Sequence, residues 1–80
     1  MFALPRLGSP ETIAQAERHI TEMMERLMAQ RARIEEIERR GHHALLPEAR
    51  RFLRDMEQTL EIARGHLCLE LEAAKENPTT

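Results

Sequence analysis

The chain has 80 residues, enough for one small domain, and its 12 basic and 14 acidic residues give a formal net charge of -2. This balance argues against a basic protein that coats nucleic acid and against an acidic disordered tail. With 41% apolar residues the chain can form a core, but it has no Trp, no Tyr and only two Phe, which excludes an aromatic platform for stacking single-stranded nucleic acid.

No targeting or membrane-spanning segment stands out. Residues 1–8 are apolar but contain Pro5 and Arg6, so they make a poor signal peptide, and no apolar run approaches the ~20 residues needed to span a bilayer. We therefore expect a cytoplasmic protein that has no membrane contact and carries no cofactor. Eleven of the 12 basic residues are Arg, a bias typical of GC-rich bacterial genomes.

A first long helix is predicted over residues 10–40. Ser9 can cap its first free amides, and Pro10 suits the first helical position. No further Gly or Pro follows until Gly41, which ends the helix. At 1.5 Å per residue, this helix is roughly 45 Å long.

A second helix is predicted over residues 47–76, after a turn at 41–46. Pro47 is tolerated in a first turn, and a start as early as Ala44 also fits. An Asn-Pro pair directly after the helix ends it. Gly65 lies inside this helix, and we expect a packing reason for it and no break.

Apolar residues recur in both helices with the spacing of a coiled coil, sustained over four heptads. In the first helix, the two series are Ile13, Ile20, Leu27 and Ile34, and, three residues later, Ala16, Met23, Gln30 and Ile37. In the second helix, they are Leu46, Leu53, Leu60, Leu67 and Ala74, followed by Ala49, Met56, Ala63 and Glu70. The pattern predicts a packing seam along each helix.

The short connection predicts that the helices fold back antiparallel. With the turn centred near residues 43 and 44, the neighbouring pairs are Ile34 with Leu53, Leu27 with Leu60, Ile20 with Leu67, and Ile13 with Ala74. Large residues face large ones along most of the seam. The predicted fold class is therefore all-α, an antiparallel two-helix hairpin of the coiled-coil type.

The apolar residues outnumber the positions of this seam. Ile62, Gly65 and Leu69 form a second stripe, and a helix that is apolar on several faces is normally buried on several faces. Because a thin hairpin buries little surface, we predict that two hairpins pair into a four-helix bundle as a homodimer, with Ala63 and Gly65 allowing close approach. The alternatives are docking of a different protein or cover by residues 1–8.

The residues that we assign to the core or the oligomer interface are Ile13, Ile20, Met23, Leu27, Ile34, Ile37, Leu46, Phe52, Leu53, Met56, Leu60, Ile62, Leu67 and Leu69. Gln30 is a polar residue within the seam. It either fixes the register of the helices at a cost in stability or lies at the edge of the seam near water.

Two histidines could take part in a metal site. His19 and Glu22 share a face of the first helix, and the turn places His19 at nearly the level of His66, which shares a face with Glu70. Di-iron bundles use Glu-x-x-His pairs, whereas here alanine stands three residues before each histidine. We therefore expect histidines that flank the seam without a metal, and a His/Glu metal-binding bundle is the third functional hypothesis.

The turn end is mildly basic, with seven arginines and five acidic residues between positions 31 and 55. A partner-binding tip would consist of Arg39, Arg40, His42, His43, Arg50 and Arg51. Glutamates interleave with these arginines and can pair with them along the helix, so no strong basic stripe results. A nucleic-acid-associated regulator that uses paired tips is the second hypothesis.

Cys68 is the one candidate nucleophile, and a single cysteine cannot form an internal disulfide. His66, two residues away, points to a different side of the helix, while His19 could be a neighbour across the hairpin. The sequence has no glycine-rich loop and no serine besides Ser9. We expect no enzymatic activity and no catalytic residue.

Three stretches resemble small uncharacterised helical-hairpin proteins of proteobacteria: AERHI at 16–20, IEEIERRGHH at 34–43 and RFLRDMEQTLEI at 51–62. The glycine-histidine that closes the first helix is the most distinctive part. Members often carry an acid or threonine after that pair, whereas His43 and Ala44 stand here. The resemblance implies a helical hairpin and brings no activity, ligand or functional residue.

Together these patterns predict a non-enzymatic, self-associating hairpin that serves as a protein–protein interaction, regulatory or structural module. Its expected partners are a second copy of the chain and an unidentified protein, without nucleic acid.

Overall fold

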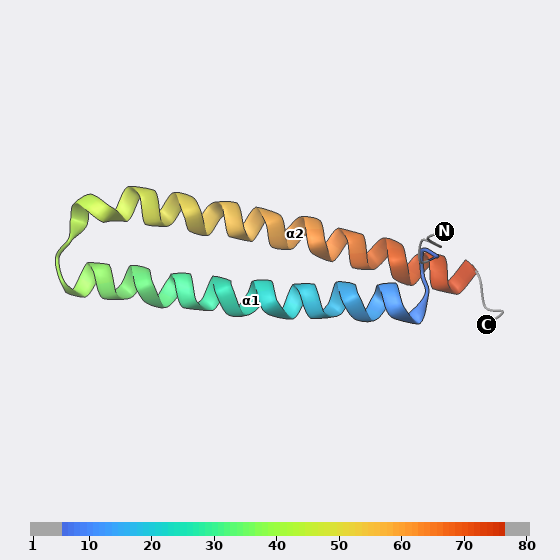
Figure 1. The fold of residues 1–80 in the computed structure, drawn as a ribbon. Helices are drawn as coiled ribbons and strands as arrows, with labels where there is room; N and C mark the ends of the chain where they lie inside the picture. Colours follow the sequence, from blue (N-terminus) through green and yellow to red (C-terminus); the bar gives the residue numbers. More distant parts are fainter. Residues whose placement is uncertain (1–5, 77–80) are drawn as a thin grey trace, which may run out of the picture.

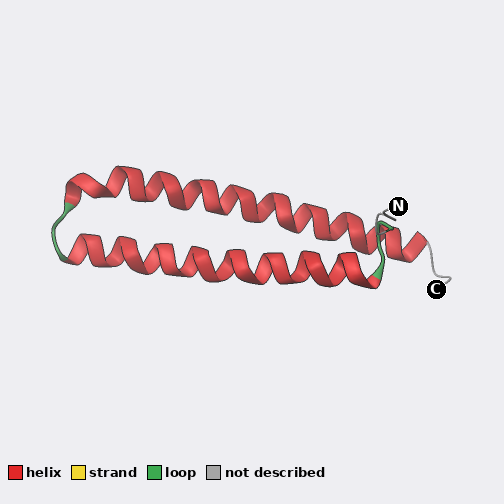
Figure 2. Cartoon of the chain, in the orientation of Figure 1, coloured by secondary structure: helices red, strands yellow, loops and turns green. Residues whose placement is uncertain are grey.

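Two long helices account for almost all of residues 6–76, which the structure, a computed structural model, describes. α1 spans Pro10–Arg39 and α2 spans Leu46–Glu76, and a short 3-10 turn, η1, covers His43–Leu45 between them. The helices run antiparallel side by side (Figure 1), and the described residues contain no strand (Figure 2). The predicted all-α hairpin is confirmed.

The start of α1 follows from local sequence signals. Ser9 has extended backbone angles, and its Oγ accepts a hydrogen bond from the Thr12 N–H at 3.2 Å. Pro10 occupies the first helical position, where the absence of an N–H leaves nothing unsatisfied. The serine cap and the proline therefore act together to begin the helix.

The end of α1 is a glycine stop with both of its expected hydrogen bonds. Gly41 has φ 73°, a left-handed conformation that glycine adopts without steric cost. Its N–H donates to the Glu38 carbonyl at 3.1 Å, and the His42 N–H donates to the Ile37 carbonyl at 3.1 Å. These bonds satisfy carbonyls that the helix end would otherwise leave without partners.

α2 begins at Leu46, one residue before the predicted start, and η1 leads directly into it. The Leu45 N–H donates to the His42 carbonyl at 3.0 Å, so much of the predicted turn at 41–46 is itself helical. Pro47 lies in the first turn of α2, where a missing N–H costs little. The Asn-Pro pair predicted to end α2 lies outside the described residues.

The core is a single row of side chains between the helices, gathered in two clusters. The open-end cluster consists of Met23, Leu60 and Ala63, with Ile20 packed against them. The tip cluster consists of Ile34, Ile37 and Leu46, with Ala49 and Leu53 packed against them. Leu27 is also buried. No side chain among residues 6–76 is completely shielded from solvent, because the molecule is only one layer of two helices, measuring 57 × 27 × 15 Å.

The structure divides the residues assigned to the core or the interface into two groups. Besides the two clusters, the seam contains the half-buried side chains of Ile13, Met56 and Leu67. Phe52, Ile62 and Leu69 instead lie outside the core, with exposed fractions of 56%, 65% and 61%. Ile62 and Leu69 belong to the second stripe, which is displaced around α2 from the seam, and Phe52 lies beside the seam. Their assignment to an oligomer interface stays a prediction.

Gln30 lies within the seam and not at its wet edge. Its side chain is buried, and its Nε2 donates a hydrogen bond to the Ala49 carbonyl of α2 at 3.0 Å. A backbone carbonyl has a second lone pair for such a bond. Because the bond joins one position of α1 to one position of α2, it favours a single register of the two helices.

One expectation about the small residues is wrong, and the other stays a prediction. Ala63 is buried in the open-end cluster, so it is not available for close approach by a second hairpin. Gly65 is exposed, and nothing lies within 4 Å of the place where its Cβ would stand. α2 continues through Gly65 without a break, as predicted, but the hairpin itself offers no packing reason for this glycine.

Replacing Gly65 with alanine should raise the free energy of unfolding by about 0.5–1 kcal/mol, because alanine loses less backbone entropy in a helix and the added methyl group meets open space. Urea unfolding followed by circular dichroism measures this change. Ala32→Gly, an exposed position within α1, is the matched control and should lower stability by a similar amount. A loss of stability in Gly65→Ala would instead show that a second body packs on this side of α2.

Candidate interaction surface

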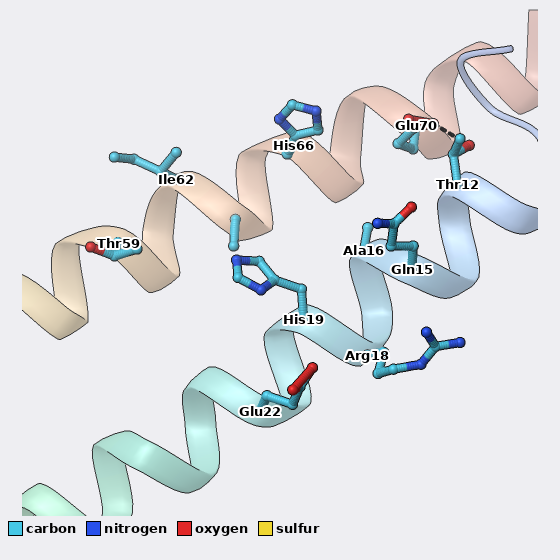
Figure 3. A pocket seen from close by; sticks show the side chains of 11 residues that line it. Thr12, Gln15, Ala16, Arg18, His19, Glu22, Thr59, Ile62, His66 and Glu70 are labelled. Carbon is cyan, nitrogen blue, oxygen red and sulfur yellow. Dashed lines mark hydrogen bonds between the residues drawn. The ribbon is translucent and has the colours of Figure 1, made fainter. Parts of the chain in front are cut away.

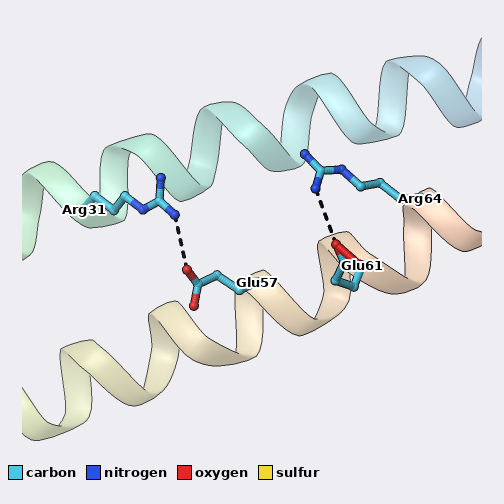
Figure 4. A network of polar contacts seen from close by, with 4 residues as sticks. All are labelled: Arg31, Glu57, Glu61 and Arg64. Carbon is cyan, nitrogen blue, oxygen red and sulfur yellow. Dashed lines mark hydrogen bonds and ion pairs between the residues drawn. The ribbon is translucent and has the colours of Figure 1, made fainter.

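On one face of the hairpin, ion pairs join α1 to α2, and we call this the paired face. Arg31 of α1 meets Glu57 of α2 at 3.2 Å (Figure 4), and Arg50 of α2 meets Glu38 of α1 at 3.1 Å. These side chains are about half exposed, so each pair contributes at most about 1 kcal/mol to stability. Their main effect is to cover this side of the seam with solvated charge.

The opposite face, which we call the open face, carries large apolar side chains along α2 and at the last residue of η1. Leu45, Phe52, Ile62 and Leu69 form this apolar stripe, and each is more than half exposed. The spacings of seven, ten and seven residues place them on one side of the helix. Several large apolar side chains exposed on one side of a helix indicate contact with another macromolecule, so this stripe is the candidate interaction surface.

Two shallow hollows follow the open face between the helices. The first lies near the open end and is lined by residues that include His19 and Glu22 of α1 and Ile62 and His66 of α2 (Figure 3). The second lies at the turn end and is lined by residues that include Gln30, Arg33, Leu45 and Phe52. Both hollows are open to solvent, which suits contact with another macromolecular surface better than enclosure of a small molecule.

The structure brings all four metal-site candidates to one hollow without forming a metal site. His19, Glu22, His66 and Glu70 line this hollow, in agreement with the level that the turn predicts (Figure 3). Among residues 6–76, however, no three His, Cys, Asp or Glu side chains are placed to share one ion. One of the four candidates, Glu70, is engaged in hydrogen bonds within the hairpin.

Glu70 links α2 to the start of α1. Its side chain is only 5% exposed, and its Oε2 accepts hydrogen bonds from the Gly8 N–H at 2.6 Å and the Thr12 Oγ1 at 2.9 Å. Figure 3 shows the bond to Thr12. The carboxylate thus lies beside the N-terminal end of α1, where free amides and the helix dipole favour negative charge. This engagement explains why a carboxylate occupies a position of the apolar seam.

Gly8 allows the residues directly before α1 to lie against the backbone of α2. It has φ 84°, and a Cβ built on it would stand 2.6 Å from the Ala74 nitrogen and 2.9 Å from the Ala73 carbonyl carbon. Only glycine fits so close to another backbone in this conformation. Leu7 is 55% exposed at this place, and the rest of the predicted N-terminal cover lies outside the described residues.

At the turn end, several of the predicted tip arginines are paired within the hairpin. Arg39 and Arg40 both bond to Glu36 along α1, the latter at 2.7 Å. Arg50 pairs with Glu38 across the hairpin. The two tip histidines, His42 and His43, are exposed, and Arg51 lines the second hollow. Internal pairing lowers the positive potential of the tip, so the geometry does not favour a phosphate-binding surface there.

Cys68 is exposed on α2 as a free thiol. Position 68 is two residues from His66, which turns the two side chains to nearly opposite sides of the helix. His19 lines the hollow near the open end, and Cys68 is not among the residues around that hollow. The arrangement therefore does not bring a histidine base to this thiol.

The fold and its surface define a class, an all-α antiparallel hairpin with one face closed by ion pairs and one apolar face left open. Comparison with protein-family models, curated proteins and solved structures found no match. The resemblance to proteobacterial hairpin proteins thus stays a prediction. Within residues 6–76, neither helix combines the length and the apolar character needed to cross a membrane.

Proposed function

We propose that this chain is a non-enzymatic protein–protein interaction module whose hairpin pairs with a second copy through the open face, giving a four-helix assembly. The observation that carries the proposal is the apolar stripe of Leu45, Phe52, Ile62 and Leu69, which the hairpin leaves more than half exposed. Burial of apolar surface is the dominant favourable term in protein association. A second hairpin would remove this surface from water.

The thinness of the core supports the same proposal. The hairpin is 15 Å across its narrowest dimension, and its buried apolar residues form one row. Small chains with a single row of core residues commonly gain stability by oligomerisation. Pairing through the open face would add a second layer to the core without disturbing the ion pairs of the opposite face.

Light scattering on dilute protein tests the proposal. We expect the wild-type chain to have the mass of a dimer, and Ile62→Glu to raise the dissociation constant about 100-fold, because a dimer loses two buried isoleucines worth roughly 1.5 kcal/mol each. Met28→Glu is the matched control, since Met28 is 66% exposed against 65% for Ile62 but does not belong to the apolar stripe. It should leave the dimer intact.

Circular dichroism should show that both variants remain helical, because both positions are exposed in the hairpin. A folded wild-type monomer at low micromolar concentration would contradict the proposal. Equal weakening by the two substitutions would also contradict it, since it would show that association does not depend on the open face.

A further inference from the structure

The apolar stripe reads nearly the same in both directions along α2. Leu45 and Leu69 lie twelve residues on either side of position 57, and Phe52 and Ile62 lie five residues on either side of it. All four side chains are exposed. When two identical helices pack antiparallel about position 57, each leucine therefore meets the other leucine of a second copy, and each Phe52 meets an Ile62.

The exposed polar residues between them follow the same pattern. Glu48 and His66 lie nine residues on either side of position 57, and Asp55 and Thr59 lie two residues on either side. The antiparallel arrangement therefore places the Glu48 carboxylate opposite the His66 imidazole of the second copy, a complementary pair. A parallel arrangement would place Glu48 and Asp55 beside their own copies, which like charges disfavour.

Thr59 is suited to the centre of such a contact. Its Oγ1 donates a hydrogen bond to the Asp55 carbonyl of its own helix at 2.9 Å. Because the hydroxyl already has a partner within α2, burial against a second helix does not leave its proton unsatisfied.

Neighbouring registers fit less well. A shift of one heptad in one direction sets Ile62 opposite Thr59 and Leu45 opposite Glu76. A shift in the other direction sets Phe52 opposite Asp55 and carries Leu69 beyond the start of α2. The register centred on position 57 is thus the one of these three that pairs every member of the apolar stripe with another apolar residue.

The charges on α1 disfavour its participation in the interface between two copies. His19, Arg26 and Arg33 recur every seven residues on α1, and His19 and Arg33 line the hollows of the open face. If two hairpins stacked with both helices of each in contact, the basic row of one copy would lie near the basic row of the other, and like charges would repel. An isologous contact made by α2 alone keeps the rows apart and leaves α1 on the outside of the assembly.

We infer that the partner of the open face is α2 of a second copy. The two α2 helices pack antiparallel about a two-fold axis that passes between them at the level of residue 57. This inference rests on the proposed self-association and adds its geometry: Leu45 against Leu69, Glu48 against His66, Phe52 against Ile62 and Asp55 against Thr59, twice in each dimer. In this geometry α2 and Leu45, the residue directly before it, supply the whole interface, and the two hollows lie beside it.

Disulfide trapping between two different variants tests this register. Both variants carry Cys68→Ala to remove the natural thiol; one also carries Asp55→Cys and the other Thr59→Cys. Mixed in a glutathione redox buffer, they should form the disulfide-linked heterodimer. Each variant alone should form roughly tenfold less disulfide, because its two cysteines are offset by about 6 Å along the helix axes in addition to the distance between the helices. That combined distance exceeds the usual Cα separation for a disulfide.

A third variant, His66→Cys with Cys68→Ala, distinguishes the registers. A link between positions 55 and 59 with none between 55 and 66 supports the inference. A link between 55 and 66 alone indicates the register shifted by one heptad and overturns it. A dimer by light scattering without either link overturns the α2 geometry but leaves the proposed self-association standing, whereas a monomeric wild-type chain overturns both.

Discussion

Replacing Leu60 with alanine is expected to lower the free energy of unfolding by about 2–4 kcal/mol. Leu60 is 6% exposed and packs with Met23 and Ala63 in the open-end cluster. The substitution deletes methylene and methyl groups of the Leu60 side chain. The folded state then loses the free energy gained by burying these groups and also their packing contacts. For a chain of this length, whose total stability is about 4–12 kcal/mol, this is a large share. Urea unfolding followed by circular dichroism measures the change.

Met28→Ala is the control for this prediction. Met28 also lies within a long helix but is 66% exposed, so its truncation should change stability by no more than about 0.5 kcal/mol. Both variants should be compared at one protein concentration, because a dimer gains stability with concentration. Similar losses in the two variants would show that the core does not lie along the seam.

Glu70→Ala is expected to lower the free energy of unfolding by about 1–3 kcal/mol, because it leaves the Gly8 N–H without its acceptor and removes one of the acceptors of the Thr12 hydroxyl. The change is concentrated at the start of α1. Hydrogen exchange should therefore show faster exchange of the Gly8 amide, while amides of the tip cluster keep their protection.

Two further variants separate the hydrogen bonds from other effects of this substitution. Glu72→Ala removes an exposed carboxylate from the same part of α2 and should leave both stability and exchange nearly unchanged. Glu70→Gln keeps an oxygen that can accept from Gly8 and should retain part of the stability. Slow exchange of the Gly8 amide in Glu70→Ala would contradict the role assigned to this carboxylate.

The helices and their pairing were predictable because their signals are local or periodic. Ser9 and Pro10 begin α1 through the chemistry of one turn, and Gly41 ends it through its own backbone freedom. The heptad series then orients the two helices, and the short connection forces them to be antiparallel. The one-residue difference at Leu46 arises because η1 continues into α2, a detail that no residue in the turn specifies strongly.

The tether at the open end was missed because it joins residues far apart in sequence. The heptad pattern places Glu70 in the seam, yet nothing in that pattern indicates that a backbone amide and a hydroxyl from the approach to α1 meet it. The sequence did contain a signal in Gly8, which stands directly before the cap residue. Its meaning depends on the nearness of the Ala73 and Ala74 backbone, and only the folded hairpin provides that.

The candidate surface shows the same division between pattern and context. Ile62 and Leu69 were recognised as a second stripe from their spacing, and the structure leaves both exposed. Gly65 was grouped with them, but the hairpin places no atom near it. Gln30 left two interpretations open, and its hydrogen bond to Ala49 selects the one within the seam. For each of these residues, exposure or burial depends on the neighbours that the folded hairpin brings to it, and the spacing in the sequence does not specify those neighbours.

The position of the tip cluster also bears on the order in which the chain folds. Ile37 and Leu46 are separated by nine residues, whereas Gly8 and Glu70 are separated by sixty-two. Closing a short loop costs less chain entropy than closing a long one, so folding can begin at the turn and zip toward the free ends. In that order the hydrogen bond from the Gln30 amide to the Ala49 carbonyl forms before most of the seam. Helices that pair in a shifted register cannot form this bond, so the wrong register is disfavoured early in folding.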